Sequence, residues 1–148
     1  MKLLTRWAIC FALLAGIAAN AGGATLRVGS VAGARFATGW TLDGSEMTNS
    51  RAKLLNSVNF GPAGAVATSI AITDTAAAAG SVNAALLANF DVFFIGYLND
   101  GNANAFTAAE LAAFQKWVYA GGTMIVGCDS TGYDAVCEYF GLFAGFIR

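Results

Sequence analysis

Residues 89–127 read NFDVFFIGYLNDGNANAFTAAELAAFQKWVYAGGTMIVG, and this stretch decides the fold. Its first part, DVFFIGY at residues 91–97, contains a continuous apolar run that is typical of a strand buried on both faces. Residues 107–110, Thr-Ala-Ala-Glu, form a capping box, in which the Thr hydroxyl and the Glu carboxylate satisfy free amides at a helix start. Residues 123–127, TMIVG, predict a further buried strand.

The residues between these strands predict one helix. Leu111, Phe114 and Val118 recur at helical spacing, whereas Gln115 and Lys116 belong to the outward face. The Gly-Gly pair at residues 121–122 ends the helix where a left-handed residue is needed. The stretch is therefore a strand–helix–strand unit.

The same alternation continues on both sides of this unit. Strands are expected at residues 25–32 and at residues 66–73, the second ending at Asp74, because both alternate apolar and polar positions. Helices are expected over residues 47–56, 82–87 and 133–140, the first with Met47, Leu54, Leu55 and Val58 near one face. Right-handed crossovers between such strands make a parallel sheet with helices on both sides, which is an α/β three-layer sandwich.

The first 21 residues have the organisation of a secretory signal peptide. Lys2 and Arg6 give a positive start, residues 7–17 are an unbroken apolar run of eleven, and Ala19-Asn20-Ala21 supplies small residues for cleavage. The run is too short for a membrane span, which needs about 20 apolar residues. We expect a single domain over residues 22–148 that is secreted, periplasmic or on the cell surface, with an uncleaved anchor as the alternative.

Composition excludes several classes of function. The 148-residue chain has 11% charged residues and no histidine, so Ser-His-Asp catalysis and His-ligated zinc cannot be built from it alone. Without residues 1–21, six basic residues face nine acidic ones, and no basic run predicts nucleic-acid binding. No pattern in the sequence predicts a cofactor, and no membrane contact is expected once the leader is cleaved.

Three segments of the chain resemble a known family. Residues 89–96, 106–111 and 114–129 look like the central unit of class I glutamine-amidotransferase-like domains, with the likeness extending over roughly residues 89–141. The resemblance implies a flavodoxin-like, mostly parallel sheet of four to five strands. Many such domains are non-catalytic modules of exported bacterial proteins. The order of motifs, a strand, a Thr-x-x-Glu-Leu helix start and a Gly-Gly-Thr stop before the next strand, is also similar to surface proteins with a C-terminal Pro-Glu-Pro sorting signal. The resemblance thus implies a structural or binding module whose ligand is unknown.

The alternative function is that of a cysteine-dependent hydrolase or amidotransferase-like enzyme, and it depends on Cys128. In catalytic members of the family the nucleophilic cysteine follows the strand that residues 124–127 match, and a helix start favours its thiolate. The family surrounds that cysteine with glycines, as Gly-x-Cys-x-Gly, whereas this chain has Gly127-Cys128-Asp129-Ser130. The family also uses a His and a Glu from later in the chain, and this chain has no His. We therefore interpret Cys128 as a packing residue. An exported chain could join Cys128 and Cys137 in a disulfide. However, one is expected at a strand end and the other two turns into the following helix, which separates their Cα atoms beyond the bonding range of about 7 Å, so we expect two free thiols.

Two further sets of polar residues are candidates for binding. Oxygen side chains at Asp100, Asn102 and Asn104 resemble the opening of a calcium loop, but position six is Ala105 and position twelve is Leu111, so a turn is the simpler interpretation. Ligands of open α/β sheets bind beyond the carboxyl ends of the strands. The residues expected at that edge are Arg35, Asp74, Asn99, Asp100, Asp129 and Ser130, with Phe36 and Trp40 as a binding lip or as core contacts.

The end of the sequence leaves the size of the sheet open. Residues 140–148, FGLFAGFIR, are apolar, and doubly wound sheets commonly have five or more strands. Either residues 142–147 form a last short strand or the chain is truncated relative to its relatives, and we favour truncation. An exposed sheet edge would then promote self-association.

Overall fold

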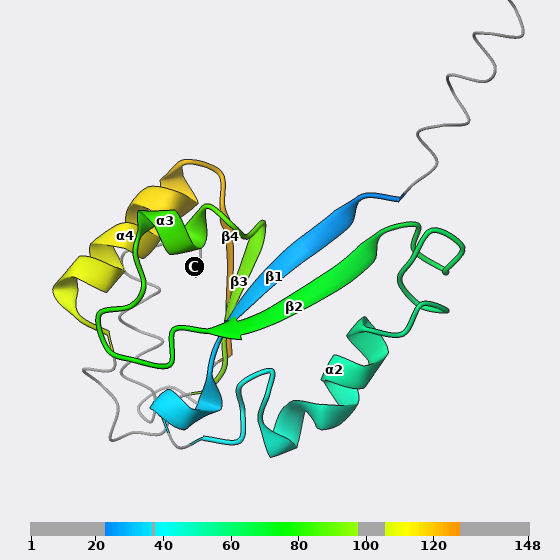
Figure 1. Ribbon diagram of the computed structural model, residues 1–148, viewed down its shortest axis with the longest axis horizontal. Coiled ribbons are helices and arrows are strands. Elements are labelled where there is room, and N and C mark those ends of the chain that lie inside the picture. The colour runs from blue at the N-terminus through cyan, green and yellow to red at the C-terminus, as the bar shows by residue number, and fades with distance from the viewer. Residues whose placement is uncertain (1–22, 37, 98–105, 128–148) are drawn as a thin grey trace, which may run out of the picture.

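A computed structural model describes residues 23–36, 38–97 and 106–127 (Figure 1). Its strands are β1 (Thr25–Val31), β2 (Ser69–Thr75), β3 (Val92–Ile95) and β4 (Thr123–Val126). Its helices are the short 3-10 turns η1 (Gly33–Arg35) and η2 (Ser45–Met47) and the α-helices α2 (Thr48–Leu54), α3 (Ala84–Leu87) and α4 (Ala108–Tyr119). The expected helix at residues 133–140, the Cys128–Cys137 separation and the apolar end lie outside the described residues.

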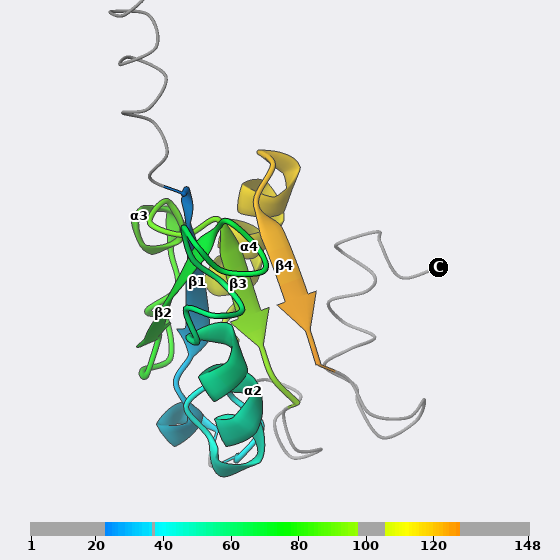
Figure 2. The same ribbon diagram turned by 90° about the vertical axis from the view of Figure 1, so that its right-hand side faces the viewer.

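The four strands form one parallel sheet in the order β2-β1-β3-β4. β1 pairs with β2 over its whole length, from Thr25 opposite Ser69 to Val31 opposite Thr75. α2 lies on one face of the sheet, and α3 and α4 lie on the other (Figures 1 and 2). The fold is therefore the expected three-layer α/β sandwich with a flavodoxin-like parallel sheet.

The main core lies between the sheet and the α3–α4 layer. Phe93, which is fully buried, packs its ring edge-on against Phe114 of α4, with 5.2 Å between the ring centroids. Phe114 in turn lies edge-on to Phe106 at 5.5 Å. Leu87 of α3 joins this cluster and is also fully buried. Burying aromatic rings of this size contributes the largest part of such a core.

The opposite face of the sheet is covered unevenly. Val28 at the centre is buried, and the register places Val92 and then Thr123 beside it on the same face. Val92 and its neighbour Phe94 are only half-buried, and Ile125 on β4 is 49% exposed. The apolar run at residues 91–97 therefore has one fully buried face rather than the two that its composition predicted.

The predicted helix boundaries hold where local chemistry defines them. Thr107 caps α4: its hydroxyl accepts a hydrogen bond from the Glu110 amide, and the Glu110 carboxylate accepts one from the Thr107 amide, which completes the predicted capping box. Gly121 has a φ of 103°, as its place after the helix required. α3 instead begins at Ala84, two residues later than expected, because Asn83 caps it by accepting a hydrogen bond from the Leu86 amide.

The start of β2 and the end of α2 also differ from expectation. β2 begins at Ser69, because pairing starts only where it meets Thr25, and Val66 instead forms an isolated bridge with Phe60. α2 ends at Leu54, so Leu55 and Val58 lie beyond the helix and are 48% and 74% exposed rather than on a buried stripe. Among the described residues, no helix is both long and apolar enough to cross a bilayer.

Candidate functional site

The position of a ligand site in this class of sheet follows from its topology. The chain passes from β1 outward to β2, then returns past β1 to β3 on the other side. The connections therefore reverse direction between β1 and β3, and a crevice at the carboxyl ends of those two strands is the usual place for a ligand.

Residues 38–44 occupy this position. Ser30, near the carboxyl end of β1, and Thr41 are both fully buried. The Leu42 amide donates a hydrogen bond to the Ser30 hydroxyl, at 3.4 Å. The Thr38 hydroxyl donates to the carbonyl oxygen of Tyr97, at 3.1 Å, just beyond β3. The 38–44 loop thus spans both strands at the switch point.

Gly96 lets the loop approach the end of β3. A Cβ atom at this position would collide with the carbonyl oxygen of Trp40, so only glycine fits while the loop holds its place. The Trp40 side chain is 47% exposed, whereas Phe36 is buried in the main core. Of the two aromatic residues proposed as a binding lip, one is therefore a core residue and the other lies on the loop.

Asp43 holds the loop from within. Its carboxylate accepts hydrogen bonds from the Gly33 amide, at 3.0 and 3.2 Å, and from the Thr41 hydroxyl, at 2.6 Å. These bonds connect the loop to η1, which follows β1. The carboxylate is used in folding the loop back onto the sheet.

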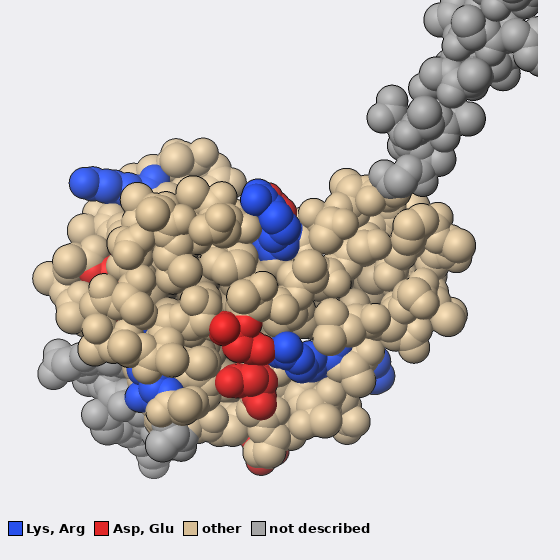
Figure 3. Space-filling view, in the orientation of Figure 1, with Lys and Arg blue, Asp and Glu red and all other residues tan. Residues whose placement is uncertain are grey.

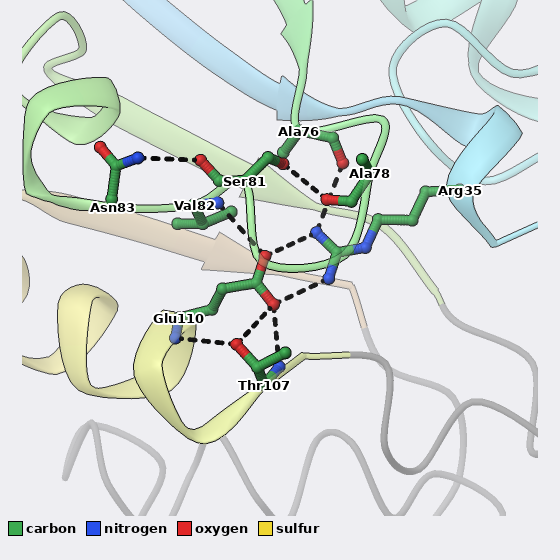
Figure 4. A network of polar contacts seen from close by, with 8 residues as sticks. All are labelled: Arg35, Ala76, Ala78, Ser81, Val82, Asn83, Thr107 and Glu110. Atoms are coloured by element: carbon green, nitrogen blue, oxygen red, sulfur yellow. Dashed lines mark hydrogen bonds and ion pairs between the residues drawn. The ribbon is translucent and has the colours of Figure 1, made fainter.

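Arg35 lies in a second polar centre at the same edge (Figure 4). Its guanidinium forms a two-point ion pair with Glu110, at 2.9 Å for each contact, and both side chains are buried. The carbon of the guanidinium sits 5.0 Å from the ring centre of Phe36 and 4.8 Å from that of Phe106. This stacking covers the charge with aromatic faces, an arrangement suited to the planar guanidinium.

Glu110 joins three segments of the chain through its carboxylate. Burial acts to raise the pKa of this group, because it disfavours the charged form. The hydrogen bonds from Arg35 act in the opposite direction, and so do those from the backbone amides of Thr107, Val82 and Gly80. Together they outweigh burial and lower the pKa from 4.5 to about 2, so the carboxylate is charged at neutral pH.

Asp74 is used in a third ion pair. It lies near the end of β2, and its carboxylate contacts Arg51 of α2, with a closest approach of 2.8 Å. Both side chains are half-buried. The pair ties α2 to its face of the sheet, where that helix buries none of its own residues.

The structure describes two of the predicted edge residues, Arg35 and Asp74, and places both at the carboxyl edge of the sheet. Arg35 and Asp74 lie there as partners of Glu110 and Arg51 rather than of each other. The other candidates lie outside the described residues: Asn99, Asp100, Asn102, Asn104, Cys128, Asp129 and Ser130. Within the described part of the chain, no three His, Cys, Asp or Glu side chains are grouped so that they could hold a metal ion.

Sequence reasoning missed the roles of Ser30, Thr41 and Asp43, and it identified Glu110 only as a cap. The spacing of Asp43 from Thr41, two residues apart, is a local turn signal that could have been used. The partner of Glu110 lies 75 residues away in the sequence, beyond any local pattern. No protein-family model, curated protein or solved structure matches the chain.

Proposed function

We propose that the chain is a non-catalytic structural or binding module of an exported protein, located in the periplasm, in the medium or on the cell surface. The observation that supports this most is the filling of the switch point by the 38–44 loop. An enzyme of this class needs that crevice for its substrate. Here Ser30, Thr41 and Leu42 are buried in it.

The charged residues of the same edge favour the same proposal. Arg35 and Glu110 are buried and paired, and Asp43 binds its own loop. A catalytic acid or base needs a pKa near the operating pH and access to a substrate. Glu110, with a pKa of about 2 and four sets of donors, has neither property.

The proposed location outside the cytoplasm rests on the signal-peptide pattern of residues 1–21. The basic start, the eleven-residue apolar run and the small residues at 19–21 have the order that a signal peptidase substrate requires. Export of the chain and sequencing of its mature N-terminus test this directly. A mature chain that begins at residue 22 is expected, and retention of residues 1–21 would favour the anchor.

The alternative is a cysteine-dependent hydrolase or amidotransferase-like enzyme. Cys128 directly follows Gly127 after β4, so its place in the chain is one at which a nucleophile could stand. A cysteine nucleophile requires an activating base, and the chain contains no histidine for that role. A base supplied by another chain would be needed.

Thiol alkylation separates the two functions. We expect iodoacetamide at pH 7 to modify the cysteines no faster than it modifies a small model thiol, because the chain has no histidine to activate a thiol. The variant Cys128→Ser reports the contribution of that thiol, and Cys137→Ser is the matched control. A rate tenfold or more above the model thiol that disappears only in Cys128→Ser would overturn the non-catalytic proposal.

A further inference from the structure

The free edge of β2 presents a regular row of backbone groups. The Ser69 amide donates to the Ala24 carbonyl at 3.0 Å, and the Ala32 amide donates to the Thr75 carbonyl at 2.8 Å. Because a strand alternates its bonding direction, the odd-numbered residues of β2 bond to β1. The backbone groups of Ile70, Ile72 and Asp74 therefore point outward, and no other strand of the described part pairs with β2.

This edge lacks the features with which proteins usually protect an exposed strand. Such edges carry lysine, proline or a bulge, or are very short. β2 has seven residues in continuous register, without proline or lysine, and no charged residue occurs anywhere in residues 54–73. Its one charge, Asp74, is paired with Arg51 of its own chain. Figure 3 shows the end of the molecule that carries the 55–68 loop without charged side chains on this face.

We propose that two copies of the chain associate through β2, antiparallel across a two-fold axis at Ile72, so that the two sheets become one. A two-fold contact uses the same edge on both copies and closes as a dimer, whereas a head-to-tail contact of β2 with β4 would continue into a ring or a filament. The inference rests on the sheet edge and is independent of the proposed function.

The axis at Ile72 follows from the charges and the bonding pattern. With this axis, Ile72 faces its own equivalent, and Ile70 faces Asp74 of the second copy. The outward-pointing backbone groups of Ile70, Ile72 and Asp74 in each copy then all face backbone groups of the other copy. An axis at Asp74 would place two carboxylates directly opposite each other, which is unfavourable.

The other face of β2 leaves room for the second copy. Ala71 and Thr73 are exposed and small. The axis places Ala71 of one copy opposite Thr73 of the other. The half-buried side chains of Ile70 and Ile72 would gain apolar cover from their equivalents on the opposite face of the joined sheet.

The association is tested by sedimentation of the purified chain over a range of concentrations. We expect a monomer–dimer equilibrium. Ala71→Lys and Thr73→Lys should each raise the dimer dissociation constant at least tenfold, because each brings a lysine to the edge. Ala112→Lys, at an exposed position of α4, is the matched control and should leave the equilibrium unchanged. Circular dichroism and the thermal midpoint verify that each variant is folded. A chain that stays monomeric at millimolar concentration, or a dimer that none of the β2 lysines weakens, would overturn the proposal.

Cysteine cross-linking tests the register without charged substitutions. Cys10, Cys128 and Cys137 are first replaced by serine, and Ala71→Cys and Thr73→Cys chains are prepared separately. Residues directly opposite in a pair without mutual hydrogen bonds have Cα atoms about 4.5 Å apart, within disulfide range. Mixing the two chains should give the mixed cross-linked dimer. Cross-linking of either variant only with itself, or of neither in the mixture, would contradict an axis at Ile72.

Discussion

The guanidinium of Arg35 and the carboxylate of Glu110 meet in a two-point ion pair whose side chains are 4% and 0% exposed. The pair connects the turn after β1 with the first turn of α4, and the Val82 amide adds the loop between β2 and α3. Three connections at one edge of the sheet thus depend on one carboxylate. A buried charge is stabilised only while its partners remain.

Replacing Arg35 should therefore be strongly destabilising. In Arg35→Met the Glu110 carboxylate stays buried without its ion-pair partner, and the free energy of unfolding should fall by about 3–5 kcal/mol. Arg27→Met is the matched control, because Arg27 also contacts a carboxylate, that of Asp91, but on the exposed surface. Urea denaturation of both variants measures the difference. Equal losses of unfolding free energy in Arg35→Met and Arg27→Met would show that the buried pair stabilises the fold no more than the exposed one.

The pH dependence of stability should identify Glu110. Its pKa is about 4.5 in an unfolded chain and about 2 in the folded one, so its contribution is complete above pH 4.5. That contribution is lost as the pH falls from 4.5 toward 2. Asp91, whose pKa the hydrogen bonds of Arg27 also lower to about 2, titrates in the same range.

Denaturation of the parent and of Glu110→Gln at pH 7, 4.5, 3 and 2 separates these two groups. The loss between pH 4.5 and 2 should be smaller in Glu110→Gln than in the parent chain. Asp91→Asn gives the corresponding value for the surface pair. A Glu110→Gln profile that runs parallel to that of the parent over this range would contradict the assignment.

The capping box allows a finer test at Thr107. Its hydroxyl accepts from the Glu110 amide at 3.3 Å and lies 3.1 Å from the Glu110 carboxylate, to which it donates. Thr107→Val keeps the shape of the side chain but loses both bonds, and should cost about 1 kcal/mol, the usual value of an N-cap. Thr107→Ser keeps the hydroxyl and should stay close to the parent in urea denaturation. Equal destabilisation of the two variants would show that the methyl group, not the cap, matters.

The features predictable from the sequence are those whose partners lie close along the chain. Thr107 and Glu110 are three residues apart, and Gly121 directly follows a helical pattern, so local chemistry determined both. The limits of β2 depend instead on where β1 begins, 44 positions earlier in the register, and the apolar pattern at Val66 carried no information about that. Leu55 and Val58 fit a helical stripe, but the helix ends before them.

The candidate site depended even more on distant contacts. Arg35 was expected at the carboxyl edge, but nothing in the sequence indicated that Glu110, 75 residues later, would neutralise it. The filling of the switch point depends on Gly96 meeting the backbone of Trp40, a contact between two loops. Glycine has many reasons to occur in a loop, so its presence alone did not predict this contact.

That contact provides the most direct test of the filled switch point. In Gly96→Ala the new Cβ would overlap the Trp40 carbonyl oxygen, so the 38–44 loop must move away from β3. We expect a loss of about 1–3 kcal/mol in the free energy of unfolding and a change in Trp40 fluorescence, recorded with Trp7 and Trp117 replaced by Phe. Gly121→Ala is the control: it is strained by its φ of 103° but has no atom within 4 Å, so it should lose about 1 kcal/mol and leave Trp40 unchanged. If Gly96→Ala were as stable as the parent, with unaltered Trp40 emission, the loop would not be packed against β3 in solution, and the switch point would be open to a ligand.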